Sequence, residues 1–323
     1  MTAEDQDSLR EAFRGCVLGS AIGDAIAQPF KGWSPARIDR EPGDLARQLG
    51  RSPARYSEDT ALTIVAAEWL LEEPALDLRS LAVRIAETYD TDRGYGRTTT
   101  EFLRRLHDGE SWETASSHCF PRGSFGNGAA ARVGPLALWF RADRTAMDRA
   151  VETAAALTHC HPLGVAGAIQ QARQIVIALE HRGAPFDPIA IAVELRSTTG
   201  SQEYRQKLRA VEECLAKPVG NKLVRDRLGC NATALGSVPT ALFCFLSHPE
   251  SFQDAIVAAV ALGGETDSIA SMTGAIAGVY HGAKGIPDRW LGRLEDGAKG
   301  RSYIERTADR LLERCSTMSS RSP

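Results

Sequence analysis

The residues best suited to chemistry stand in two short oxygen-rich stretches. Residues 57–60 read Ser-Glu-Asp-Thr and residues 265–268 read Glu-Thr-Asp-Ser, and each opens a long apolar run. One such stretch alone fits an ordinary helix start, because hydroxyls cap helices and acids complement the helix dipole. Two such stretches weaken that explanation, since carboxylates on buried helices are rare unless they are paired or bound to a metal. Packing that gathered these acids would require a hard divalent cation, and oxygen ligands favour Mg²⁺ or Mn²⁺ over zinc.

A third stretch, residues 122–138, reads "RGSFGNGAAARVGPLAL". A Gly-rich turn before a helix exposes backbone N–H groups that suit phosphate, and Phe125 is placed to stack on a base or a ribose. No strand precedes the turn and no P-loop lysine follows it, so an ordinary Gly-rich loop with a helix cap explains it equally well. Arg132 fits a phosphate or a nearby carboxylate, and the sequence does not choose between them.

Helices must position these residues. The segment "SEDTALTIVAAEWLLEE" starts at Ser57 and stops before Pro74, and "DSLREAFRGCVLGSAIGDAIA" has helical spacing with Asp7 or Ser8 as its cap. "AAARVGPLALWFRA" continues the pattern, and convincing period-2 runs are absent from the sequence. Ala- and Gly-rich helices indicate close packing of their backbones. We predict an all-α, single-domain, multi-helix fold over residues 8–316 and a disordered tail at 317–323.

Composition narrows the class of protein. The chain has 323 residues and a net charge of −3, which argues against direct nucleic-acid binding and against a membrane partner. Its seven cysteines lack disulfide or metal spacing, and its first residues lack an apolar signal segment. We expect a cytoplasmic protein.

Several of these segments together carry a family resemblance. "FRGCVLGSAIGDAIAQPF", "YSEDTALTIV", "DRGYG", "GSFGNG", "LTHCHP", "SVPTA" and "GGETDSIASMTG" stand in the order seen in the ADP-ribosylglycohydrolase family, which the chain resembles from about residue 10 to 295. That family includes the dinitrogenase reductase-activating glycohydrolase and the ADP-ribosylserine hydrolases, and three of the segments look closest to the latter. The resemblance implies an all-α fold with a metal-lined cleft that hydrolyses the bond between ADP-ribose and an acceptor.

The resemblance also implies which residues form the site. It implies Mg²⁺, two ions in number, with Mn²⁺ as an alternative, and a substrate that is ADP-ribosylated protein, serine-linked first, or O-acetyl-ADP-ribose. The metal ligands carried over by position are Ser57, Glu58, Asp59, Glu265, Asp267 and Ser268. The residues carried over for ADP-ribose binding are Gly123, Ser124, Phe125, Gly126, Asn127 and His159, with the loop holding the diphosphate and distal ribose.

The chain departs from the family pattern at one critical position. Both acidic stretches carry Glu where the family has Asp, which keeps the charge but lengthens the arm. The family's glutamate after the first helix is replaced by Lys31, so no catalytic residue is assigned. Asp39 or Glu41 is a candidate substitute from the following loop. Three functions stay open: a hydrolase of ADP-ribose adducts, an ADP-ribose-binding protein of the same fold with weak or no hydrolysis, and a structural protein without a ligand.

Overall fold

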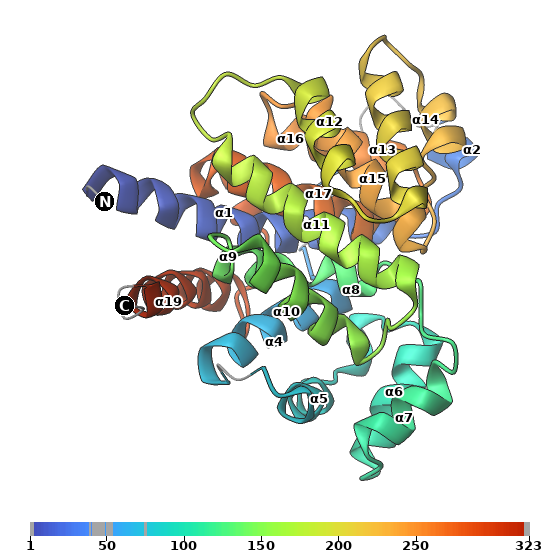
Figure 1. The fold of residues 1–323 in the computed structure, drawn as a ribbon, viewed down its shortest axis with the longest axis vertical. Coiled ribbons are helices and arrows are strands. Elements are labelled where there is room, and N and C mark those ends of the chain that lie inside the picture. The colour runs from blue at the N-terminus through green and yellow to red at the C-terminus, as the bar shows by residue number, and fades with distance from the viewer. Residues whose placement is uncertain (1–2, 39, 41–48, 50–53, 74–75, 320–323) are drawn as a thin grey trace.

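The computed structural model describes residues 3–38, 40, 49, 54–73 and 76–319. In this part of the chain the regular structure is helical and no strand forms, which confirms the predicted all-α, single-domain fold (Figure 1). The short 3₁₀ helices are η1 (Gln28–Phe30), η3 (Thr91–Arg93) and η4 (Ala283–Gly285). The α-helices in chain order are α1 (Ala3–Ala27), α2 (Pro35–Ile38), α4 (Glu58–Glu72), α5 (Leu78–Glu87), α6 (Arg97–His107), α7 (Trp112–Cys119), α8 (Gly128–Ala131), α9 (Gly134–Trp139), α10 (Arg144–Ala156), α11 (Pro162–Glu180), α12 (Pro188–Thr198), α13 (Gln202–Leu215), α14 (Asn221–Arg227), α15 (Ala234–Leu246), α16 (Phe252–Ala261), α17 (Thr266–His281), α18 (Asp288–Leu291) and α19 (Arg301–Ser319).

The structure confirms one predicted helix start and corrects two other predictions. α4 has the predicted start, with Ser57 as its cap. The cap predicted at Asp7 or Ser8 is wrong, because α1 already begins at Ala3. The segment predicted as one helix after the Gly-rich loop is two, α8 and α9, and Pro135 in the first turn of α9 explains the break, since proline cannot donate to a preceding turn.

Two predictions fall wholly or partly on residues outside the described ones. α19 runs to Ser319, so the predicted disordered tail overlaps the end of this helix, and residues 320–323 lie outside the described residues. Asp39 and Glu41 also lie outside them. None of the described helices is both long and apolar enough to cross a bilayer.

α1 and α17 cross in direct backbone contact at the centre of the molecule. A Cβ built on Gly19 would lie 2.2 Å from the carbonyl oxygen of Gly274, and one on Gly274 would lie 2.0 Å from that of Gly19. A Cβ on Gly23 would lie 2.0 Å from the carbonyl oxygen of Ala270. Only glycine allows two helices to approach this closely, so the glycines expected from the sequence to serve packing do so here.

The contact is antiparallel, so the end of α1 meets the start of α17. The Thr266 hydroxyl at the start of α17 donates to the carbonyl of Ala27, the last residue of α1, at 3.2 Å. The Ser20 and Ser271 hydroxyls hydrogen-bond to each other at 2.9 Å within the same interface. Around this pair, α11, α15 and α16 pack against α17, while α19 packs against α1 and α4 (Figure 1).

The glycine contact leads to a prediction about stability. Gly274→Ala should lower the free energy of unfolding by about 1–3 kcal/mol, the range for an overpacked core, because backbone atoms must move to admit the methyl group. Gly200→Ala is the control: nothing lies within 4 Å of a Cβ at Gly200, and it should change stability by less than about 0.5 kcal/mol. Urea denaturation of both variants checks this, and equal midpoints would contradict it.

Candidate active site

The two acidic stretches meet in the structure. Ser57 caps α4, its Oγ accepting from the Asp59 amide at 3.3 Å, and the Ser268 hydroxyl at the start of α17 donates to Asp59 Oδ2 at 2.6 Å. Asp59 and Asp267 are almost completely buried. Residues that are 209 positions apart in the chain are therefore joined by one short hydrogen bond. The expectation that packing gathers these oxygens holds for both helix starts.

Asp24, near the end of α1, links this helix to the start of α4. Its Oδ2 accepts from the Ser57 amide at 2.9 Å, the Thr60 amide at 3.2 Å and the Thr60 hydroxyl at 2.6 Å. Burial, followed by the nearby charges of Asp59 and Asp267, raises the pKa of Asp24 to about 7. Asp24 is thus a buried, hydrogen-bonded acid that orients the turn carrying residues 57–60.

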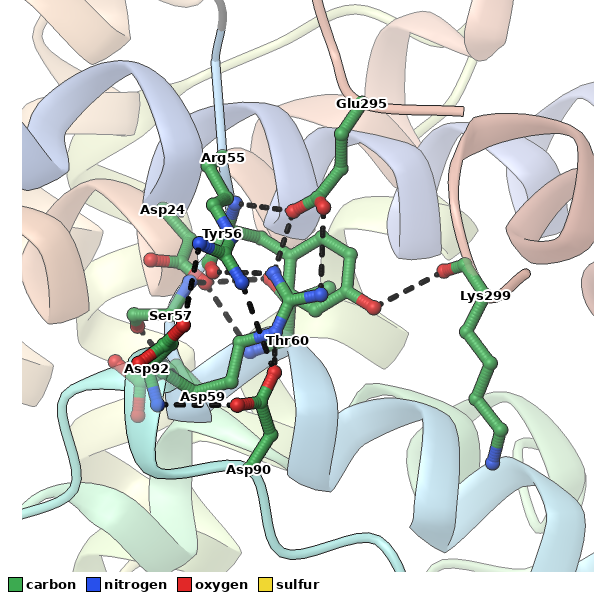
Figure 2. A network of polar contacts seen from close by, with 11 residues as sticks. Asp24, Arg55, Tyr56, Ser57, Asp59, Thr60, Asp90, Asp92, Glu295 and Lys299 are labelled. Atoms are coloured by element: carbon green, nitrogen blue, oxygen red, sulfur yellow. Dashed lines mark hydrogen bonds and ion pairs between the residues drawn. The ribbon is translucent and has the colours of Figure 1, made fainter. Parts of the chain in front are cut away.

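A second carboxylate holds the same segment from the other side. Glu295 Oε1 accepts from the Tyr56 amide at 3.0 Å and from Arg93 Nη1 at 2.5 Å, and Arg93 also donates to the Tyr56 carbonyl at 2.9 Å. Figure 2 shows Asp24 and Glu295 both directed at the backbone that carries Tyr56 and Ser57. The Arg93 guanidinium stacks over the Tyr56 ring at 3.8 Å. Residues of the "DRGYG" segment and of the C-terminal region therefore fix where α4 begins.

The gathered carboxylates raise one another's proton affinity. Burial first, and then the charge of Asp59, raise the pKa of Glu58 to about 8. Burial and Asp267 raise the pKa of Asp59 to about 6, and the same two causes raise the pKa of Glu265. The charged forms of these acids are therefore energetically unfavourable unless a cation lies among them.

Lys31 supplies one positive charge at this place. Its Nζ lies 2.8 Å from Asp267 Oδ2 and 3.5 Å from Glu58 Oε1, and so it pairs with both acidic helix starts. Burial alone would lower the pKa of Lys31, but the charges of Asp267, Glu58 and Asp59 raise it well above its ordinary value. Lys31, which the resemblance sets at the family's glutamate position, is thus a charged ammonium that faces the acids.

The oxygens that remain suit a hard cation. Asp267 Oδ1, Asp24 Oδ1 and Glu58 Oε2 are buried and accept no hydrogen bond, which is unusual for carboxylate oxygens. Within the described residues, however, no three Asp, Glu, His or Cys side chains already converge as a complete ligand set. The donor chemistry thus fits Mg²⁺ or Mn²⁺, while the acids still have to draw closer together around an ion.

The Gly-rich loop borders the same cleft, but its amides are mostly engaged. The Gly123 amide donates to the Phe120 carbonyl at 2.8 Å, the Gly126 amide to Ser124 Oγ at 3.1 Å, and the Asn127 amide to the Ala232 carbonyl at 2.9 Å. These N–H groups are therefore not free for a diphosphate, in contrast to what the loop pattern suggested.

Side chains of the loop are the groups left open to a ligand. Asn127 Nδ2 is buried and has no acceptor in the described structure, and the Phe125 ring is half exposed at the rim. The Phe125 ring also contacts the ring of His161, with their centroids 5.3 Å apart. One amide donor and one aromatic face thus point to recognition by side chains.

Arg132 and His159 form a buried polar chain beneath this loop. Arg132 Nη2 donates to the Ala154 carbonyl at 3.2 Å and to Thr158 Oγ1 at 3.0 Å. The partners of this atom are therefore a backbone carbonyl and a hydroxyl, and not a carboxylate. Thr158 Oγ1 lies 2.6 Å from His159 Nδ1. Burial, followed by the charge of Arg132, lowers the pKa of His159 to about 3, and the ring is neutral at pH 7. The Nε2 atom of His159 faces Gly126 and Gly128 on the cleft side of the ring.

These parts enclose one cleft of about 900 Å³. Lys31 and the acids Glu58, Asp59 and Glu265 line it together with Ser268, while Ser57 and Asp267 lie buried behind them. All six residues carried over for ADP-ribose binding line the cleft as well: Gly123, Ser124, Phe125, Gly126, Asn127 and His159.

Sequence reasoning missed two cations of this cleft. Arg97 and Arg122 line it, both are exposed, and neither forms an ion pair with a described carboxylate. Each stands beside a motif that was noticed, "DRGYG" for Arg97 and "GSFGNG" for Arg122. Their position next to motifs was the available signal, but exposed arginines are common and only the fold shows that both face one cleft.

Comparison with known proteins identifies the class. The model of the ADP-ribosylglycohydrolase family matches residues 5–321, nearly the whole chain. The chain therefore belongs to the ADP-ribosylglycohydrolase family, which confirms the resemblance and the expectation of a hydrolase.

Individual relatives span most of the chain. It is 35% identical over 314 residues to ADP-ribosylhydrolase ARH3 of Danio rerio, a match that covers 86% of this chain and 85% of that protein. It is 30% identical over 319 residues to ADP-ribosylhydrolase ARH3 of Homo sapiens, covering 86% and 87%. ADP-ribosylarginine hydrolase Tri1 of Serratia proteamaculans is 26% identical over 315 residues, covering 90% and 76%.

A solved structure shares the fold. It is described as an ADP-ribosylglycohydrolase-related protein complex and superposes with a TM-score of 0.72 at 24% identity, covering 96% of this chain and 99% of that chain. This likeness supports the all-α architecture.

The Glu295 contacts lead to a prediction about stability. Glu295→Ala should lower the free energy of unfolding by about 2 kcal/mol, because it removes the acceptor of the Tyr56 amide and the carboxylate that Arg93 Nη1 donates to. Glu180→Ala removes the exposed ion pair with Arg144 and should cost less than about 1 kcal/mol. Thermal denaturation of the two variants compares them. A loss from Glu295→Ala no larger than from Glu180→Ala would show that Glu295 does not hold this segment.

Proposed function

We propose that this protein hydrolyses the glycosidic bond between ADP-ribose and an acceptor, with serine-linked ADP-ribose on proteins as the preferred substrate and O-acetyl-ADP-ribose as a second. The observation that carries the proposal is the single cleft that joins the Gly-rich loop to the two acidic helix starts. Relatives named ADP-ribosylhydrolase ARH3, at 30–35% identity, support the reaction. The serine preference rests on the segments "DRGYG", "SFGNG" and "SVPTA".

ADP-ribose would lie along the cleft with its charged and aromatic parts met by different residues. Arg97 and Arg122 supply the positive charge that a diphosphate requires. Phe125 offers a ring face for stacking, and Asn127 Nδ2 and His159 Nε2 offer hydrogen-bonding groups to ribose or phosphate oxygens. With the diphosphate and the base bound by these residues, the ribose that bears the acceptor would lie toward the acids.

Mg²⁺ or Mn²⁺ would be held by the oxygen-bearing side chains of the two helix starts, namely Ser57, Glu58, Asp59, Glu265, Asp267 and Ser268. When bound, such an ion would orient ribose hydroxyls and lower the pKa of the attacking water. The support comes from the unpartnered buried oxygens of Asp267 and Glu58 and from an oxygen-only donor set.

The chain's own acids perform the rest of the reaction. Cleavage at the anomeric carbon develops positive charge on the sugar, and the carboxylates of Glu58, Asp59 and Glu265 on the cleft wall would stabilise it. A carboxylate would also take the proton of the attacking water, and a protonated carboxyl would give one to the acceptor oxygen as its bond to the sugar breaks. Lys31 cannot take that proton while it is protonated, and its acidic neighbours keep it so.

One observation favours a second function, that of an ADP-ribose-binding protein with weak hydrolysis. The Lys31 ammonium lies 2.8 Å from Asp267 Oδ2, where the family has a glutamate. A cation at that position can strengthen the binding of a diphosphate and does nothing to activate water. The two functions share the cleft and differ only in turnover.

Product analysis with purified protein tests the proposed function. The substrates are peptides with Ser-linked and Arg-linked ADP-ribose and O-acetyl-ADP-ribose, each with Mg²⁺ or with EDTA. We expect free ADP-ribose from the Ser-linked peptide in Mg²⁺ and at least about 100-fold less in EDTA, the low end of what a group acting in the transition state contributes. Binding of ADP-ribose without product from any substrate would favour the second function. Equal rates in EDTA would remove the metal from the proposal.

The open donor of Asn127 leads to a prediction about affinity. Asn127→Ala should weaken ADP-ribose binding about 5–30-fold, because one hydrogen bond of about 1–2 kcal/mol is lost. Arg149→Ala, an exposed arginine outside the cleft lining, is the control and should leave the affinity unchanged. Isothermal titration calorimetry with ADP-ribose measures both. Equal affinities for Asn127→Ala and the unmodified protein would exclude Asn127 from the binding site.

A further inference from the structure

We infer that the Lys31 ammonium takes the place of one divalent cation in this cleft, so that the site binds a single ion. The inference rests on the proposed divalent-cation site and states how many ions it holds. It differs from the two-ion site expected from the family resemblance, and the reason lies in the position of one side chain.

The ammonium occupies the point where the two acidic helix starts approach each other. Nζ lies 2.8 Å from Asp267 Oδ2 at the start of α17 and 3.5 Å from Glu58 Oε1 at the start of α4. A cation that bridged the same two oxygens would lie about 2.0–2.1 Å from each, the contact distance of Mg²⁺. The ammonium and such an ion cannot occupy this space together, and their like charges repel.

Backbone contacts hold Lys31 at this place. The Gly32 amide donates to the Gly264 carbonyl at 2.9 Å, and the Gly264 amide donates to the Trp33 carbonyl at 3.0 Å. Gly264 has a φ of +75°, which glycine adopts readily, and the Lys31 amide donates to the Gln28 carbonyl at 3.0 Å. The turn that carries Lys31 is thus hydrogen-bonded to the residue just before the second acidic stretch. These hydrogen bonds fix the backbone from which the ammonium reaches the acids.

The ammonium disfavours a second ion through repulsion. The four predicted ligand carboxylates are Glu58, Asp59, Glu265 and Asp267. With the ammonium counted, one divalent ion leaves a net charge of −1 and two leave +1, so the totals are equal in size and do not decide the number of ions. A second ion beside the ammonium adds repulsion in a largely buried site and gains no new ligand.

The oxygens that the ammonium leaves free serve the single ion. Asp267 and Glu58 each give one oxygen to Lys31, and their other oxygens, Oδ1 and Oε2, are buried without a partner. Asp59 and Ser268, joined at 2.6 Å, lie beside them. Drawn together around one ion and completed by water, these groups would supply the ligands of a six-coordinate site.

Counting bound Mn²⁺ tests the inference. The full-length protein is titrated with Mn²⁺ at pH 7.5, and the electron paramagnetic resonance signal of free Mn²⁺ gives the number bound per chain. We expect one ion for the unmodified protein and two for Lys31→Glu. Lys31→Met should also bind two, the second about 10–100-fold more weakly than in Lys31→Glu, the usual effect of losing one supporting group at a metal site. Because Lys31 is one-third exposed, these variants should fold, and circular dichroism verifies it.

Lys299→Met provides the matched control. Lys299 pairs with Glu68 at 2.8 Å and is exposed to a similar extent, 36% against 33% for Lys31, but it lies outside the cleft lining. It should bind one ion, as the unmodified protein does. Two ions in the unmodified protein, or one ion in every Lys31 variant, would overturn the inference and leave the proposed hydrolase untouched. No ion in the unmodified protein or in any variant would overturn the inference and the proposed metal site together, while the product analysis would judge the reaction by itself.

Discussion

The backbone contact between α1 and α17 is the constraint on which the rest of the structure depends. Reciprocal glycines at positions 19 and 274 let the two helices touch, and a methyl group on either would meet a carbonyl oxygen near 2 Å. Helices that touch along their backbones cannot slide or rotate freely. Their ends are therefore fixed in register, and the antiparallel direction puts the end of α1 beside the start of α17. Every acid of the cleft is placed relative to this crossing.

The crossing makes a concentration of buried negative charge that stability alone would not favour. Asp24 at the end of α1 receives three hydrogen bonds from the start of α4, and Asp59 receives one from the start of α17. Three helices are thereby tied together through carboxylates whose pKa values are raised by burial and by one another. Such an arrangement is electrostatically unfavourable, and a cation among the carboxylates reduces their repulsion. The ammonium of Lys31 does so in part. The cluster of acids is therefore partly neutralised by a side chain of the protein itself.

The opposite wall of the cleft follows a different rule. Its Gly-rich loop uses its amides to hold its own shape, and the buried Arg132–Thr158–His159 chain supports it from below. A loop whose backbone donors are engaged is rigid before a ligand binds, so that little conformational freedom is lost on binding. The groups that stay open toward the cleft are then side chains at its rim, namely Arg97, Arg122 and Phe125. The cleft thus joins a charged, buried end to a rigid, amphipathic end.

The sequence by itself determined the helical class, the start of α4, the two oxygen-rich turns and the family, because each of these depends on neighbouring residues or on short motifs. The family resemblance also led to the expectation that Lys31 stands at the position of the family's glutamate. The sequence did not determine that this ammonium pairs with Asp267, that the loop amides are engaged within the protein, or that α8 and α9 are separate helices. The Lys31–Asp267 pair and the hydrogen bond from the Asn127 amide to Ala232 depend on distances between atoms far apart in the chain, and a difference of 1 Å changes an ion pair or a hydrogen bond into none. Tertiary packing sets those distances, and here the close crossing of α1 and α17 decided which charges meet.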